Sequence, residues 1–260
     1  MLIVLFGLIC GTALGLTGGG GSILAVPLLV YGVGIPFHHA VTISLLIVGV
    51  TALIGFCPKI KKGEVELSAG VTLAITGMVF APIGSYVSHY LNDQVLLIAF
   101  SILMAFIGVW SLFKSKFIAK ENNLKQPYCR YLPNGKLQLT IKCRAVLFIS
   151  GIITGVLTGL FGVGGGFLIV PALILAAKMP IKKAISTSLL IIFLVSVSGF
   201  ISHIRHASID VFITLFFVIG SILGMLFAGK IKVHLSDSAL QKIFSLALII
   251  LGGVMLSIQL

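Results

Sequence analysis

The chain has 260 residues, of which 58% are hydrophobic and 9% are charged. A soluble domain carries about 25% charged residues, so this composition excludes a soluble globular protein and predicts an integral protein of the lipid bilayer. The formal net charge of +12 does not indicate a nucleic-acid partner, because the basic residues lie in short loops between apolar runs, as is typical of the cytoplasmic loops of membrane proteins.

The apolar runs lie at about 2–17, 21–34, 40–57, 66–89, 94–113, 145–161, 167–178, 184–202, 209–229 and 238–258. A membrane-spanning helix needs about 20 residues. The first two runs in each half of the chain are shorter than this, and a glycine cluster separates them. Each short pair is therefore either two tilted spans or two half-helices of a re-entrant hairpin.

The glycine clusters belong to an internal repeat. The segment Gly15–Pro27 returns, shifted by 144 residues, as Gly159–Pro171, and the similarity extends as far as Phe100-Ser101 and Phe244-Ser245. Further matched pairs are Pro36 with Pro180, Gly55 with Gly199 and Asp93 with Asp237. The repeat predicts a first membrane repeat over 1–113, a basic cytoplasmic linker over 114–144 and a second membrane repeat over 145–260.

Basic residues predict how the repeats are oriented. If each glycine hairpin returns to the side it entered, 17 of the 18 Lys and Arg residues face the cytoplasm and only Arg205 lies outside. If each glycine segment crosses once, the repeats are parallel and six of these residues face outward. The positive-inside rule favours inverted repeats, with both termini extracytoplasmic.

The predicted fold is therefore all-α, with two inverted repeats, each made of a glycine-broken hairpin of short helices plus three spanning helices. In the cytoplasmic linker, Cys129 and Cys143 are expected to be reduced.

The glycine clusters predict a binding site for a small anion. The second half-helix of each hairpin is expected to begin near Gly21 or Ser22 and near Gly166, where a helix N-terminus presents free N–H groups and the positive end of its dipole. Glycines allow an anion to approach the backbone. The alternative is that they only allow close helix packing. The candidate residues are Gly18, Gly19, Gly20, Gly21, Ser22, Gly162, Gly164, Gly165 and Gly166.

Hydroxyl side chains follow each hairpin by about 15 residues. Thr42 and Ser44 in the first repeat, and Thr187 and Ser188 in the second, can donate hydrogen bonds to an oxyanion without burying a charge. The alternative is bonding to the backbone of their own helices. Pro27 and Pro171 lie in the second half-helices and are expected to kink them.

Charged side chains are absent from the middle of the apolar runs, so neutral donors and helix dipoles would have to bind the anion. A coupling proton would travel on the substrate itself or on one of the outer histidines. These are His38, His39, His89, His203 and His206. The sequence shows no metal-ligand spacing, cofactor motif or catalytic motif, so neither a cofactor nor an enzyme is expected.

The duplicated motif resembles the sulfite exporter TauE/SafE family of multi-pass permeases. Gly18–Pro27 and Gly162–Pro171 match its two glycine-rich copies. Ala40–Leu45 and Ala184–Leu189 match the segments that follow, although Thr42-Ile43-Ser44 replaces the adjacent Thr-Ser pair of Thr187-Ser188.

The resemblance implies transport of small sulfur-containing anions, such as sulfite or organosulfonates, across the bacterial inner membrane, without fixing the direction. Together with the inverted repeats it leads us to expect a transporter that works by alternating access. The alternatives are an uptake permease for another small anion and, from other classes, a membrane-embedded enzyme or a scaffold.

Overall fold

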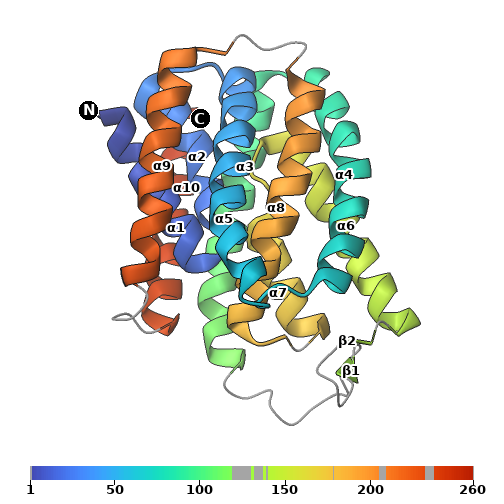
Figure 1. Ribbon diagram of the computed structural model, residues 1–260. Coiled ribbons are helices and arrows are strands. Elements are labelled where there is room, and N and C mark those ends of the chain that lie inside the picture. Colours follow the sequence, from blue (N-terminus) through green and yellow to red (C-terminus); the bar gives the residue numbers. More distant parts are fainter. Residues whose placement is uncertain are drawn as a thin grey trace.

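The computed structural model describes residues 2–118, 130–131, 137–138, 140–177, 179–204, 209–231 and 237–259. Over these ranges the chain forms a bundle of ten α-helices, which confirms the all-α prediction (Figure 1). Two strands of two residues each, β1 (Arg130–Tyr131) and β2 (Leu137–Gln138), pair in antiparallel fashion within the predicted linker.

The helices follow the apolar runs closely. The first half contains α1 (Leu2–Thr17), α2 (Gly21–Pro27), the π-helix η1 (Leu28–Val33), α3 (Phe37–Lys61), α4 (Leu67–His89) and α5 (Asp93–Ile118). The second half contains α6 (Ile141–Phe161), α7 (Gly166–Ala177), α8 (Ile181–His203), α9 (Val211–Ile231) and α10 (Asp237–Gln259). The shift of 144 residues therefore relates α1 to α6, α2 to α7, and so on to α5 and α10.

Among the described residues, seven helices are long and apolar enough to cross a membrane: α3, α4, α5, α6, α8, α9 and α10. The shorter apolar helices are α1 and the continuous segment Gly21–Val33. Helix α6 has 21 residues and is longer than the expected run of 145–161, because it begins in the basic segment that holds Lys142 and Arg144. Among the described helices of the second half, only α7 is as short as a half-helix.

Helices α3 and α8 form the centre of the bundle. In each of them 67% of the most apolar 18-residue stretch is buried inside the bundle, compared with 22–44% in the other long helices. The two helices run antiparallel. If Gly199 carried a Cβ atom, that atom would lie 3.3 Å from Leu45, and a Cβ on Gly49 would lie 3.4 Å from Ser196. The contacts thus move forward along α3 as they move backward along α8. The central pair therefore brings one helix from each half into contact.

The remaining helices pack in pairs that also join the two halves. Helix α1 packs along α9 and α6 along α4, while α5 packs on α10. Because the shift of 144 residues relates α1 to α6 and α4 to α9, the α1–α9 and α4–α6 pairs are equivalent. The shift also relates α5 to α10, so the α5–α10 pair is its own equivalent. Individual contacts repeat in the same way: a Cβ on Gly108 would lie 3.0 Å from Ser245 O, and one on Gly252 would lie 3.0 Å from Ser101 O.

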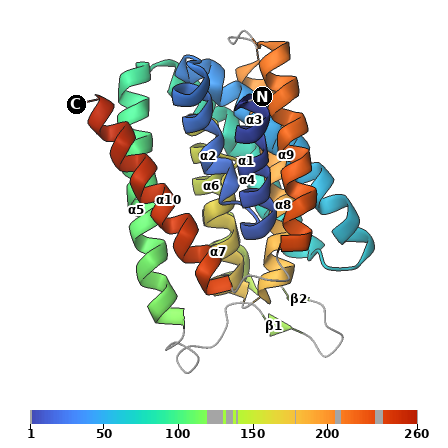
Figure 2. The same ribbon diagram turned by 90° about the vertical axis from the view of Figure 1, so that its left-hand side faces the viewer.

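The outer helices expose large apolar side chains. Val79 of α4 is 61% exposed and Phe106 of α5 is 62% exposed, and Leu226 of α9 is 59% exposed. An apolar surface of this extent is suited to lipid rather than to water. Both chain termini lie at one end of the bundle, and β1 and β2 lie at the opposite end (Figures 1 and 2).

Cys143 is an exception to the sequence-based expectations. The side chain is buried in α6 and disulfide-bonded, so the expectation of a reduced thiol is wrong in this structure. That expectation considered only the redox state of the compartment, whereas formation of a bond depends on the distance between the two sulfur atoms. Cys129 lies outside the described residues.

Candidate anion site at the paired glycine turns

The first helix of each half ends in the same way. The N–H of Gly18 donates to Leu14 O at 2.8 Å, and the N–H of Gly162 donates to Thr158 O at 2.9 Å. Both glycines are left-handed, with φ of 74° and 69°. Such a residue at the end of a helix closes the last turn and is usually glycine because a Cβ is disfavoured there. The sequence therefore breaks both helices at matched positions.

After this common start the two turns differ. Gly20 is right-handed, with φ of −63°, whereas the equivalent Gly164 and its neighbour Gly165 are left-handed, with φ of 66° and 63°. We refer to residues 18–20 as the first glycine turn and to residues 162–165 as the second. The two turns share a sequence motif but not a backbone conformation.

The next helices begin where the sequence predicts, α2 at Gly21 and α7 at Gly166. Pro27 ends α2, and the chain continues as the π-helix η1. Pro171 lies inside α7, which continues as an α-helix to Ala177. The equivalent prolines thus have different surroundings, and a π-helical turn often marks a functional segment.

The two glycine turns contact each other inside the bundle. A Cβ on Gly19 would meet the backbone of Gly166 at 2.5 Å, and one on Gly166 would lie 3.1 Å from Gly19 O. All residues of both turns are buried. Only glycine allows this approach, which places the start of α7 against the turn that precedes α2.

Ser44 and Ser188 connect each central helix to the glycine turn of the other half. The Ser44 hydroxyl lies 2.8 Å from Gly162 O, and the Ser188 hydroxyl lies 2.5 Å from Gly18 O. Each hydroxyl also lies 2.8 Å from a carbonyl of its own helix, Val41 O or Ile185 O. Both serines therefore hold the turns in place through reciprocal contacts.

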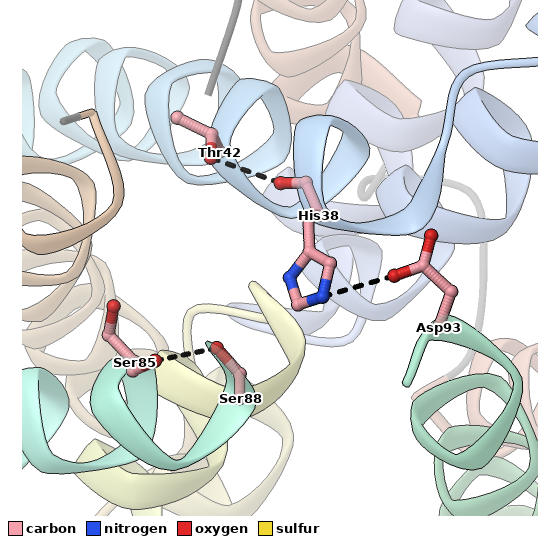
Figure 3. A network of polar contacts seen from close by, with 5 residues as sticks. All are labelled: His38, Thr42, Ser85, Ser88 and Asp93. Carbon is pink, nitrogen blue, oxygen red and sulfur yellow. Dashed lines mark hydrogen bonds and ion pairs between the residues drawn. The ribbon is translucent and has the colours of Figure 1, made fainter. Parts of the chain in front are cut away.

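The other predicted hydroxyls have different partners. Ser22 donates to Gly19 O at 2.6 Å, within the first turn. Thr42 donates to His38 O in its own helix at 3.1 Å (Figure 3). Thr187 accepts the backbone N–H of Glu66 at 3.0 Å, just before α4 begins. The structure therefore brings Ser22, Ser44 and Ser188 to the glycine turns, but not Thr42 or Thr187.

Three hydroxyls that the sequence analysis did not select lie beside the second turn. A Cβ on Gly165 would lie 3.0 Å from both Thr158 Oγ1 and Thr154 Cβ, and one on Gly164 would lie 3.3 Å from Ser196 Oγ. Their equivalents in the first half are Leu14, Cys10 and Ala52. A search for hydroxyls that occur in both repeats therefore misses all three.

A histidine cluster lies where α3 and α5 begin and α4 and α8 end. His38 Nε2 lies 3.0 Å from Asp93 Oδ1 (Figure 3). The His38 ring also stacks on the ring of His89 at a centroid distance of 5.6 Å. The ring of His203 lies 5.5 Å from that of His89, and its Nε2 is 2.7 Å from Gly159 O. The cluster occupies the end of the bundle that holds both termini (Figure 1).

Among the described residues, no Asp, Glu, Lys or Arg side chain is buried in the interior. There the buried polar side chains are serines, threonines and His203. Binding of an anion between the repeats would therefore rely on backbone N–H groups, hydroxyls and helix dipoles.

Comparisons with known proteins agree with this architecture. The sequence model of the family described as "Sulfite exporter TauE/SafE" matches residues 3–255. The chain is 36% identical over 244 residues to a probable membrane transporter protein of Xylella fastidiosa, covering 92% of this chain and 88% of the relative. It is 30% identical over 260 residues to the probable membrane transporter protein YunE of Bacillus subtilis, covering 97% and 95%. No solved structure matches the chain significantly.

The family match spans nearly the whole chain and includes both glycine turns, and the relatives cover both repeats over most of their length. The chain therefore belongs to the sulfite exporter TauE/SafE family and is a multi-pass membrane transporter.

Proposed function

We propose that this protein moves small sulfur-containing anions, such as sulfite or organosulfonates, across the bacterial inner membrane by alternating access. The observation that carries the proposal is the contact of the two glycine turns in an interior that offers neutral donors. The description of the matched family supports sulfur oxyanions as the substrate class. Backbone N–H groups at helix N-termini are suited to oxyanions of this kind.

The contacts between the halves support inverted repeats. Helices α3 and α8 are related by the shift of 144 residues and run antiparallel. The same holds for α5 and α10, in which Gly108 and Gly252 make reciprocal contacts. A two-fold axis that relates antiparallel spanning helices lies in the membrane plane, which is the symmetry of inverted repeats. With a cytoplasmic linker, both termini are then extracytoplasmic.

In this proposal the anion binds where the two turns meet. The starts of α2 and α7 supply N–H groups and the positive ends of two helix dipoles. Ser44 and Ser188 hold the turns, and the glycines keep side chains away from the backbone. Thr42 and Thr187, whose hydroxyls bond elsewhere, would line the route to the site rather than the site itself.

Alternating access requires the site to open first to one side and then to the other. The contacts between α1 and α9 and between α4 and α6 join the two halves through small residues, and inverted-repeat transporters work by rocking one set of helices against the other. Rocking of one set of helices against the other would expose the glycine turns to each side in succession.

A coupling proton would enter at the histidine cluster. His38, His89 and His203, together with Asp93, form a group at the end that we assign to the outside. The equivalents of His38 and His39 at the opposite end are Lys182 and Lys183. Histidine is the usual proton carrier near neutral pH, so we place the entry of the coupling proton at this cluster.

Flux of radiolabelled sulfite into proteoliposomes tests the proposal. Gly19→Ala places a Cβ against the backbone of Gly166 and should abolish flux, with a monodisperse size-exclusion profile in detergent showing that the variant is folded. Gly253→Ala is the matched control, because nothing lies within 4 Å of a Cβ at that position, and its flux should equal that of the wild type. An imposed proton gradient in the same assay should change the wild-type rate.

Wild-type flux in Gly19→Ala would contradict the assignment of the site to the paired turns. Absence of flux in wild-type vesicles, with any sulfur oxyanion tested, would contradict the proposed substrate class.

A further inference from the structure

The two glycine turns differ in how their backbone N–H groups are satisfied. In the first turn the N–H of Gly20 donates to Thr17 Oγ1 at 2.8 Å. In the second turn the residue equivalent to Thr17 is Phe161, which has no acceptor in its side chain. The first turn thus closes on a hydroxyl of its own helix, and the second turn has no such hydroxyl at its matched position.

An unpaired hydroxyl lies against the second turn. Ser196 of α8 is 0% exposed, and among the described residues its Oγ has no hydrogen-bond partner. It lies 3.3 Å from the point that a Cβ on Gly164 would occupy. Leaving a buried hydroxyl unpaired costs free energy, so its position against the turn calls for a partner that the described conformation lacks, such as a bound ligand.

The start of α7 supplies further donors at the same place. The N–H groups of Leu168 and Ile169 both donate to Gly165 O, at 3.1 and 3.3 Å. Helix geometry leaves the N–H groups of Gly166 and Phe167 without an acceptor inside the helix. Since α7 has 12 residues, its dipole adds a positive potential at this end.

The second turn also has hydroxyls at positions where the first turn has side chains without one. Thr154 and Thr158 flank Gly165, and their equivalents beside the first turn are Cys10 and Leu14. Ser196 itself is replaced by Ala52. These three positions carry hydroxyls in the second repeat only, whereas the hydroxyls of the first turn, Thr17 and Ser22, are already bonded to Gly20 N–H and Gly19 O within that turn.

We infer a narrower set of donors than the site proposed above: the hydrogen bonds to the anion come from the second glycine turn, with Ser196 donating to one oxygen and the start of α7 to the others. This inference rests on the proposed function. The first turn then serves as the packing partner that closes the site. In the described conformation Val48 and Ile192 lie 3.0 and 3.2 Å from the Cβ point of Gly164, so loading requires these two side chains to move away from the turn.

The KM for sulfite in proteoliposomes tests the inference. Ser196→Ala should raise the KM about tenfold or more, because hydrogen bonds to charged groups are stronger than neutral ones. Ser101→Ala is the matched control: Ser101 is a buried serine of α5 whose hydroxyl donates to Leu97 O in its own helix. Its KM should equal that of the wild type. Adding Ala52→Ser to Ser196→Ala should not restore the wild-type KM.

Each outcome has a definite meaning. A wild-type KM in Ser196→Ala, while Gly19→Ala loses flux, overturns the inference and leaves the proposed function intact. Rescue by Ala52→Ser also overturns it, because the two turns would then be equivalent. Absence of sulfite flux in the wild type overturns the proposed function and the inference together. If Ser196→Ala does not fold, Ser196→Cys conserves the size, supplies only a weak donor, and should raise the KM in the same direction.

Discussion

Ser44 and Ser188 show how single hydroxyls hold the centre of this transporter together. Each lies within hydrogen-bond distance of a glycine carbonyl in the other half of the chain. Removing either hydroxyl would leave a buried carbonyl without this donor, which typically costs about 1–3 kcal/mol. The pair therefore contributes to stability whether or not it touches the substrate.

We expect Ser44→Ala and Ser188→Ala to lower the thermal unfolding temperature in detergent by similar amounts. The similarity follows from the reciprocal geometry of the two contacts. Ser101→Ala, whose hydroxyl bonds only within its own helix, should change that temperature less. Equal temperatures for all three variants would show that the contacts between the halves add nothing to stability.

At the scale of helices, close packing depends on glycines in α1 and α6. A Cβ on Gly11 would meet the backbone of Ser221 in α9, and one on the equivalent Gly155 would lie 2.5 Å from Gly77 O in α4. Small residues allow helix backbones to approach closely in a membrane, where apolar side chains gain little by leaving lipid. These two helix pairs are the same contact made twice.

Gly11→Val and Gly155→Val should each destabilise the protein by at least about 1–3 kcal/mol, as is typical of overpacked interfaces. Gly253→Val, on an open face of α10, serves as the control and should be close to neutral. Size-exclusion profiles and thermal unfolding in detergent measure the effect. A large loss for one of the two interface variants and none for the other would contradict the equivalence of the two helix pairs.

At the scale of the whole molecule, the inverted arrangement predicts which loops face each side. Asn92 follows α4 and Pro180 precedes α8, and both are exposed. In a protein without its native cysteines, Asn92→Cys should react with an impermeant thiol reagent from outside. Pro180→Cys should react only after the membrane is permeabilised. Labelling of both positions from the same side would exclude inverted repeats with a cytoplasmic linker.

Local features of the sequence were sufficient for the elements. Hydrophobic runs and glycine breaks predicted the α-helices, the starts of α2 at Gly21 and α7 at Gly166, and the repeat itself. These succeed because hydropathy and glycine content act over a few neighbouring residues. The helix α6 was longer than its apolar run, since a helix can extend past the hydrophobic part of its sequence.

By itself, the sequence determined that this chain is an all-α membrane protein of two related halves with matched helix breaks, because composition and periodicity carry that information. Only the tertiary structure decided that Gly19 touches Gly166, that Ser44 and Ser188 hold opposite turns, and that Thr187 bonds to the backbone before α4 instead. The unpaired hydroxyl of Ser196 and the disulfide of Cys143 were also visible only there. Each of these depends on helices that are far apart in sequence or on distances between side chains, and no local pattern specifies which residues will meet when such helices pack.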